Sequence, residues 1–125
     1  MLDHVTIPVS QVERSGNFYD QVLPVLGITR LYAEGTDFAG YGAEAKAFFW
    51  IGQRNGIQTS VHIAFVSQTR AGVDRFHAAA LAAGGIDNAA PGLRPHYHQN
   101  YYGAFVLDPD GHNIEAVCHH GDGDI

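Results

Sequence analysis

The chain has 125 residues, the size of one ordinary domain, and can bury well over half of the surface that it exposes when unfolded. Its formal net charge is −6, with seven Lys and Arg against thirteen Asp and Glu and no basic block, so we expect a small-molecule partner and no nucleic-acid or membrane surface. The single cysteine, Cys118, excludes an intramolecular disulfide, and no signal peptide or apolar run of about 20 residues is present, which predicts a cytoplasmic protein.

The first half of the chain predicts a strand, a helix and three further strands. Residues 3–9 (DHVTIPV) are mostly β-branched and predict the first strand. Ser10 and Glu13 form a capping box for a helix that ends at Pro24 and Gly27. The three short strands are expected near 28–34, 38–42 and 47–52. The aromatic residues of the last one, Phe48, Phe49 and Trp50, either line an aromatic pocket wall or fill the core, and the core is favoured.

The second half begins with the same order of elements. The segment VHIAFVS (61–67) predicts a strand, Ser67 or Thr69 caps a second helix, and Gly84 with Gly85 ends it. Residues 87–100 (DNAAPGLRPHYHQN) read mainly as loop, with only a weak strand near Ile86. The final strands, YYGAFVLD and HNIEAV, are joined by a DPDG turn.

The two halves are related by an internal repeat. At an offset of 58 residues His4 falls on His62, Phe18 on Phe76 and Gly27 on Gly85. We therefore predict one α+β domain over 1–125, built from two βαβββ modules of about 1–54 and 59–120. The modules are expected to form a curved, open, mixed sheet around a cleft.

A carboxylate in the last strand needs a partner. Glu115 lies between Ile114 and Ala116 in a run that is otherwise fit for burial, and a buried glutamate is costly unless it is paired. If the two first strands line a shared cleft, His4 and His62 converge there and Glu115 completes a metal site with open positions. The competing interpretation is a salt bridge to an arginine, namely Arg14, Arg30, Arg54 or Arg94.

Three segments together resemble a known family. HVTIPVSQVERSGNFYDQVL, HIAFVSQTRAGVDRFHAAALAAGG and FVLDPDGHNIEAV are similar to the vicinal oxygen chelate superfamily, which includes glyoxalase I, extradiol dioxygenases and bleomycin-resistance proteins. The resemblance assigns the metal ligands to His4, His62 and Glu115. It implies one divalent metal per chain, with iron(II) or manganese favoured over zinc or nickel, and a homodimer.

One departure from glyoxalase I bears on the reaction. That enzyme takes a fourth ligand, usually a glutamate, from the last strand of the first module, whereas AFFWIGQ (47–53) offers no carboxylate and Glu44 and Gln53 flank the matching place. The resemblance thus implies a metal-dependent lyase, isomerase or dioxygenase whose small substrate chelates through vicinal oxygens. The alternative is a metal-free protein that sequesters a small molecule, as resistance proteins of the family do.

The stretch RPHYHQNYYG (94–103) precedes a strand that is expected to border the cleft. His98 and Tyr102 are candidates for general acid or base, and Arg94 and Tyr101 are candidates for binding substrate. The alternative interpretation is a loop packed by its own aromatic rings.

Overall fold

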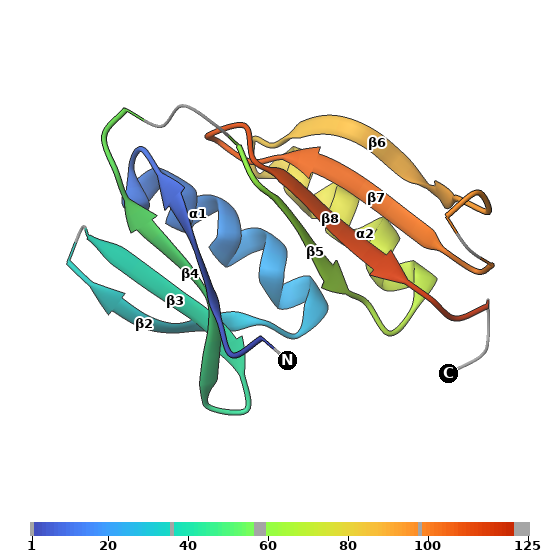
Figure 1. The fold of residues 1–125 in the computed structure, drawn as a ribbon, viewed down its shortest axis with the longest axis horizontal. Coiled ribbons are helices and arrows are strands. Elements are labelled where there is room, and N and C mark those ends of the chain that lie inside the picture. Colours follow the sequence, from blue (N-terminus) through green and yellow to red (C-terminus); the bar gives the residue numbers. More distant parts are fainter. Residues whose placement is uncertain (1, 36, 57–59, 98, 122–125) are drawn as a thin grey trace.

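The computed structural model describes residues 2–35, 37–56, 60–97 and 99–121, and it contains two successive βαβββ modules, as predicted (Figure 1). The first module comprises β1 (Val5–Val9), α1 (Val12–Val22), the short 3-10 helix η1 (Leu23–Leu26), β2 (Thr29–Glu34), β3 (Phe38–Ala43) and β4 (Lys46–Gln53). The second comprises β5 (His62–Val66), α2 (Arg70–Ala82), β6 (Ile86–Leu93), β7 (Tyr102–Leu107) and β8 (Asn113–Cys118).

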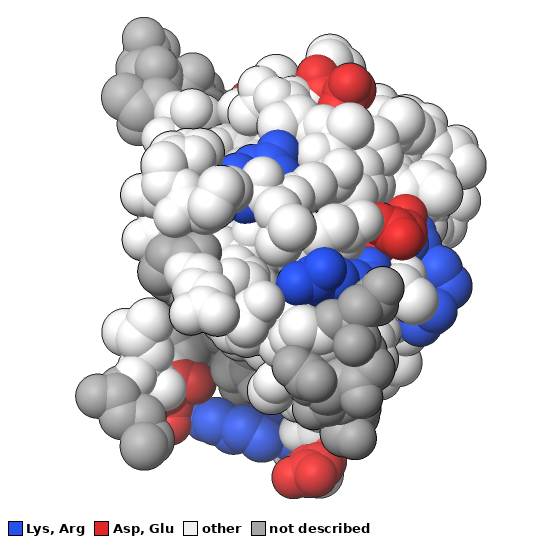
Figure 2. All heavy atoms as spheres, turned by 90° about the vertical axis from the view of Figure 1, so that its right-hand side faces the viewer, with Lys and Arg blue, Asp and Glu red and all other residues white. Residues whose placement is uncertain are grey.

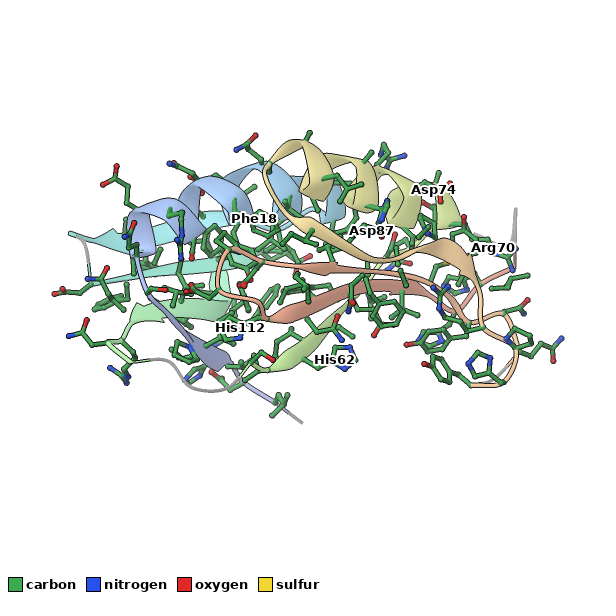
Figure 3. The ribbon with its side chains drawn as sticks, turned by 90° about the horizontal axis from the view of Figure 1, so that it is seen from above. Phe18, His62, Arg70, Asp74, Asp87 and His112 are labelled. Atoms are coloured by element: carbon green, nitrogen blue, oxygen red, sulfur yellow. The ribbon has the colours of Figure 1, made fainter. Side chains whose placement is uncertain are left out.

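Each module forms its own open, four-stranded mixed sheet. The strand orders are β1-β4-β3-β2 and β5-β8-β7-β6, with the β1–β4 and β5–β8 pairs parallel and the other pairs antiparallel. The sheets lie side by side with the edge strands β1 and β5 next to each other (Figure 1). Both helices cover the same side of the molecule (Figure 3). We call the side of the sheets that faces away from the helices the open face.

One hydrophobic core spans both modules on the helix side. It includes Phe18 and Tyr19 of α1 and Phe76 of α2, all buried. Phe49 of β4 and Phe65 of β5 meet edge to face with ring centroids 5.1 Å apart, a favoured aromatic geometry that adds to the area they bury. The two modules therefore share one core although their sheets do not pair.

The DPDG turn clamps the second module onto the first. One oxygen of Asp108 accepts the backbone N–H groups of Asp110 and His112, both at 2.9 Å, and the other accepts the buried Tyr19 hydroxyl of α1 at 2.6 Å. Asp110 in turn accepts the backbone N–H of Ser10 at 3.0 Å, and it also accepts the Ser10 hydroxyl. The motif that marks the final hairpin thus also fixes the start of α1.

His112 holds the same junction from inside the protein (Figure 3). Its ring is fully buried and donates from Nε2 to the Pro8 carbonyl at 2.6 Å, while Nδ1 accepts the Val61 backbone N–H at 3.0 Å. Every polar atom of the imidazole is therefore satisfied by backbone from the two modules.

Two predicted details of the elements are wrong. The capping box does not form, because the N-cap of α1 is Gln11 without a side-chain bond, and the Gln53 side chain accepts the Val12 N–H at 3.0 Å instead. The segment taken as loop forms the eight-residue strand β6, which runs through Pro91. β6 is the edge strand of its sheet and pairs irregularly with β7, so the sheet tolerates Pro91, which has no backbone N–H.

No helix within the described ranges is long and apolar enough to cross a membrane. On the face drawn in Figure 2, basic and acidic side chains are dispersed among uncharged ones and form no continuous basic surface.

Candidate functional site

The second module presents a buried carboxylate in contact with a histidine. Glu115 of β8 is only 1% exposed, and its Oε1 lies 2.9 Å from Nε2 of His62 on β5. Its Oε2 accepts the hydroxyl of Tyr101. Gly103 leaves space for the carboxylate because it has no side chain. A Cβ at this position would lie 3.2 Å from Oε2 of Glu115, which is closer than most Cβ contacts in proteins. Its side-chain partners among the described residues are His62 and Tyr101 rather than an arginine, and the metal site stays a prediction.

The strand register explains why these side chains meet. Ala64 of β5 is opposite Glu115 of β8, and His62 precedes Ala64 by two residues, which puts its side chain on the same face of the strand. That face is the open one, and His62 points away from the helices (Figure 3). The His62 side chain is 52% exposed, so the pair is reachable from solvent on the His62 side.

Tyr101 supports the carboxylate as a hydrogen-bond donor. Burial raises the pKa of its phenol above the ordinary value, and the bond to Glu115 and that carboxylate's charge raise the pKa further. The hydroxyl therefore keeps its proton at neutral pH and donates it to Oε2. The Tyr101 ring packs 5.0 Å from the Tyr97 ring, and His96 packs 4.4 Å from Tyr97, so this loop is also packed by its own aromatic side chains.

His4 is near this pair without joining it. It precedes β1, its side chain is exposed, and its Nδ1 lies 2.7 Å from Asp3. His4 and His62 both line a groove of about 640 Å³ between β1 and β5, with Phe48 and Phe65 among its apolar walls. Within the described ranges no three His, Cys, Asp or Glu side chains are grouped closely enough to hold a metal ion.

The other predicted site residues are placed as follows. Arg94 donates to the backbone carbonyls of Gly92 at 2.6 Å and Gly103 at 2.8 Å, which ties the end of β6 to β7. Tyr102 donates to Asp74 of α2 at 2.6 Å and thus lies on the helix side, away from Glu115. His98 lies outside the described residues. The catalytic roles of His98 and Tyr102 and the substrate-binding roles of Arg94 and Tyr101 stay predictions.

The first module has no carboxylate at the equivalent place. Thr6 follows His4 by two residues, as Ala64 follows His62, and the residue opposite Thr6 on β4 is Trp50. Glu44 lies in the turn between β3 and β4, and Gln53 caps α1. For Trp50 the core was favoured over a pocket wall, but the side chain is half-buried on the open face. The alternation along β4, which places Phe49 in the core, is the sequence signal for this position of Trp50.

Comparisons with known proteins agree with this architecture. A family model described as the Glyoxalase/Bleomycin resistance protein/Dioxygenase superfamily matches residues 1–116. A glyoxalase/bleomycin resistance protein from Albidiferax ferrireducens T118 is 33% identical, with 94% of this chain and 98% of that chain covered and a TM-score of 0.82. No curated protein matches the chain.

Two more distant structures share the fold alone. Lactoylglutathione lyase from Agrobacterium tumefaciens is 14% identical with a TM-score of 0.70, covering 94% of this chain and 92% of that one. TioX from Micromonospora sp. ML1 is 15% identical with a TM-score of 0.73, covering 96% of this chain and 99% of that one.

Proposed function

This chain belongs to the glyoxalase/bleomycin resistance protein/dioxygenase superfamily, and from that premise we propose that it is a metal-dependent enzyme acting on a small substrate chelated through vicinal oxygens. The observation that carries the proposal is the contact between the buried Glu115 carboxylate and His62 on the open face. A carboxylate that is almost fully buried is costly to maintain, and a cation beside it offsets that cost.

The donor set fits a divalent cation. Glu115 provides an anionic oxygen and His62 an imidazole nitrogen, and with His4 as third ligand they form a two-histidine, one-carboxylate set, which suits iron(II) or manganese, with zinc or nickel as alternatives. A bound cation of this kind acts as a Lewis acid toward a substrate oxygen. The Tyr101 hydroxyl holds Oε2, so it orients the carboxylate and leaves Oε1 as the oxygen directed to His62.

The side chain opposite Thr6 narrows the reaction class. Trp50 stands where a fourth carboxylate ligand and base would be needed for glyoxalase I chemistry. We therefore propose chemistry of the dioxygenase or lyase type, with glutathione-dependent methylglyoxal turnover weak or absent. Robust methylglyoxal–glutathione turnover under iron(II), manganese, nickel or zinc would contradict this choice.

The third ligand and the oligomeric state are linked. His4 and the His62–Glu115 pair do not form a three-ligand group within the described part of one chain. The unpaired edges of β1 and β5 and the 62% exposed Val66 leave surface that a second copy can cover. We therefore propose a homodimer in which His4 of one copy completes the site of the other.

A mixed dimer distinguishes this arrangement from a site within one chain. Co-expression of His4→Ala chains with Glu115→Gln chains gives mixed dimers in which one cross-chain site keeps all three native ligands. We expect about one metal per mixed dimer, whereas each variant alone binds almost none. Mixed dimers as empty as the single variants would place the three ligands within one chain.

Elemental analysis of protein purified without an affinity tag tests the metal itself. We expect about one divalent ion per chain in the wild type and close to none in His62→Ala. His77→Ala is the matched control, because His77 lies on α2 and pairs with Asp87 of β6. Equal metal content in wild type and His62→Ala would contradict the site.

The second candidate function is metal-free sequestration of a small molecule. The observation that favours it is the groove between β1 and β5, whose walls are mainly apolar. Ligand binding that is unchanged after complete metal removal would support this function over catalysis. In either case we propose a cytoplasmic location, since the lone buried Cys118 needs no oxidising compartment.

A further inference from the structure

The two modules differ in chemistry at one equivalent position. In the second module Glu115 is opposite Ala64, which follows His62 by two residues. In the first module Trp50 is opposite Thr6, which follows His4 by two residues. Both side chains lie on the open face. The first module therefore offers an aromatic surface where the second offers a carboxylate.

Trp50 is part of an aromatic platform, by which we mean Tyr32, Phe38 and Trp50. The Tyr32 ring is nearly parallel to the indole, at 17° and 5.7 Å between centroids, and the Phe38 ring meets it edge to face at 5.8 Å. Tyr32 is 54% exposed. The indole lies against the backbone of β3 at Gly40, which has no side chain. A Cβ at Gly40 would lie only 2.6 Å from a ring carbon of Trp50. Gly40 thus provides the space in which the indole rests.

The platform is flanked by two hollows. One, of about 340 Å³, lies between Trp50 and His4, so the platform is continuous with the predicted metal ligand of this module. The other, of about 400 Å³, is lined by Phe38 and Trp50 together with Asp37 and Arg54. Rigid apolar rings beside one cation and one carboxylate match a flat ring that carries polar substituents.

Stability does not explain the platform. Large aromatic side chains stabilise a fold mainly by the area that they remove from water, and Tyr32 and Phe38 leave much of theirs exposed. Clustered exposed rings of this kind mark binding surfaces. We propose that the platform is a subsite for a planar aromatic ring with polar substituents, which packs against the exposed Tyr32 and Phe38 rings next to Trp50.

This subsite deepens the proposed function, because it names the substrate class, but ring binding here does not need the metal. The test therefore uses metal-free protein. Trp50 is the only tryptophan, so its indole N–H gives a single cross-peak in a ¹⁵N-labelled spectrum. The probe is 2-naphthoate, and cyclohexanecarboxylate is the matched non-aromatic acid.

We expect 2-naphthoate to produce a saturable ring-current shift of the Trp50 cross-peak and cyclohexanecarboxylate to produce none at the same concentration. Tyr32→Leu and Phe38→Leu should each weaken 2-naphthoate binding about fivefold, the loss expected for one aromatic contact. Leu81→Ala, on the exposed side of α2, removes apolar surface elsewhere and should leave binding unchanged. The same spectra report whether each variant is folded.

Three results would overturn the subsite. The first is the lack of a saturable shift with 2-naphthoate, and the second is an equal shift with cyclohexanecarboxylate, which would indicate apolar surface without ring recognition. The third is Trp50 fluorescence that acrylamide cannot quench, which would mean that a second copy covers the platform. None of these depends on metal content, so this proposal and the metal site can fail separately.

Discussion

Replacing Tyr101 by phenylalanine tests whether this tyrosine holds the buried carboxylate. The change keeps the ring and removes the hydroxyl that donates to Glu115, which is 1% exposed and then keeps His62 as its side-chain neighbour at 2.9 Å. A hydrogen bond to a charged group contributes about 1.5–3 kcal/mol. Because Tyr101 is partly exposed, water can replace some of the lost bond, so we expect the free energy of unfolding to fall by about 1.5 kcal/mol.

The assay is urea denaturation of metal-free protein, combined with a double-mutant cycle that includes Glu115→Gln. The cycle should give a coupling energy of about 1 kcal/mol between Tyr101 and Glu115, because each single change removes the same charged hydrogen bond. Tyr97→Phe is the matched control. Tyr97 lies in the same loop and is 56% exposed, so its change should stay within about 0.5 kcal/mol.

The metal-bound protein gives an independent measure of the same contact. If Tyr101 orients a ligand, Tyr101→Phe should weaken metal binding about 10–100-fold, the loss typical of groups that support a ligand. A coupling energy near zero together with unchanged metal affinity would refute the role assigned to Tyr101. A loss of stability with unchanged affinity would limit the Tyr101 hydroxyl to stabilising the buried carboxylate, without a role in orienting a metal ligand.

Three further results are expected. Asp110→Ala should lower the free energy of unfolding in urea by about 2–3 kcal/mol, because Ser10 and the start of α1 lose a charged partner; a change below about 0.5 kcal/mol would show that the clamp is dispensable. Burial and Asp108 raise the pKa of Tyr19, so stability is retained below the unfolded value of about 10 and is lost as pH rises past it; Tyr19→Phe should flatten this slope by up to about 1.4 kcal/mol per pH unit. An unchanged slope would contradict that assignment. Light scattering at micromolar concentration should report a dimer, and a monomer there would count against the shared site.

The sequence predicted most of the elements because their signals are local. Alternating and helical apolar patterns, the glycines that end the helices and the DPDG turn all act within a few residues. The internal repeat then gave the two-module architecture. The capping box failed because the atoms that compete for the start of α1 come from Gln53 and Asp110, which are remote in sequence. The strand expected near Ile86 extends further than predicted, because the pairing of β6 with β7 outweighs the local signal of Pro91.

The structure brings one predicted histidine into contact with the glutamate, whereas the three-ligand metal site stays a prediction. The repeated histidine and the lone glutamate in an apolar strand led to the contact between His62 and Glu115. The equivalence of Trp50 and Glu115 does not follow from the repeat offset. These two positions are 65 residues apart, whereas the repeated histidines, His4 and His62, are 58 residues apart. Only the pairing of β1 with β4 and of β5 with β8 aligns them.

The equivalence of Trp50 and Glu115 means that the two modules contribute different chemical groups to the proposed site. Two identical modules would put the same donor at Trp50 and Glu115, and two carboxylates beside one metal would leave less room and more negative charge for a chelating substrate. With a carboxylate on one side and an indole on the other, the second module supplies ligands and the first supplies a surface for the body of the substrate. His4 belongs to both, since it is the proposed third ligand and lines the hollow beside Trp50. A substrate bound at this place would then have its chelating oxygens beside His4 and its ring beside Trp50, which β4 places opposite Thr6 of β1.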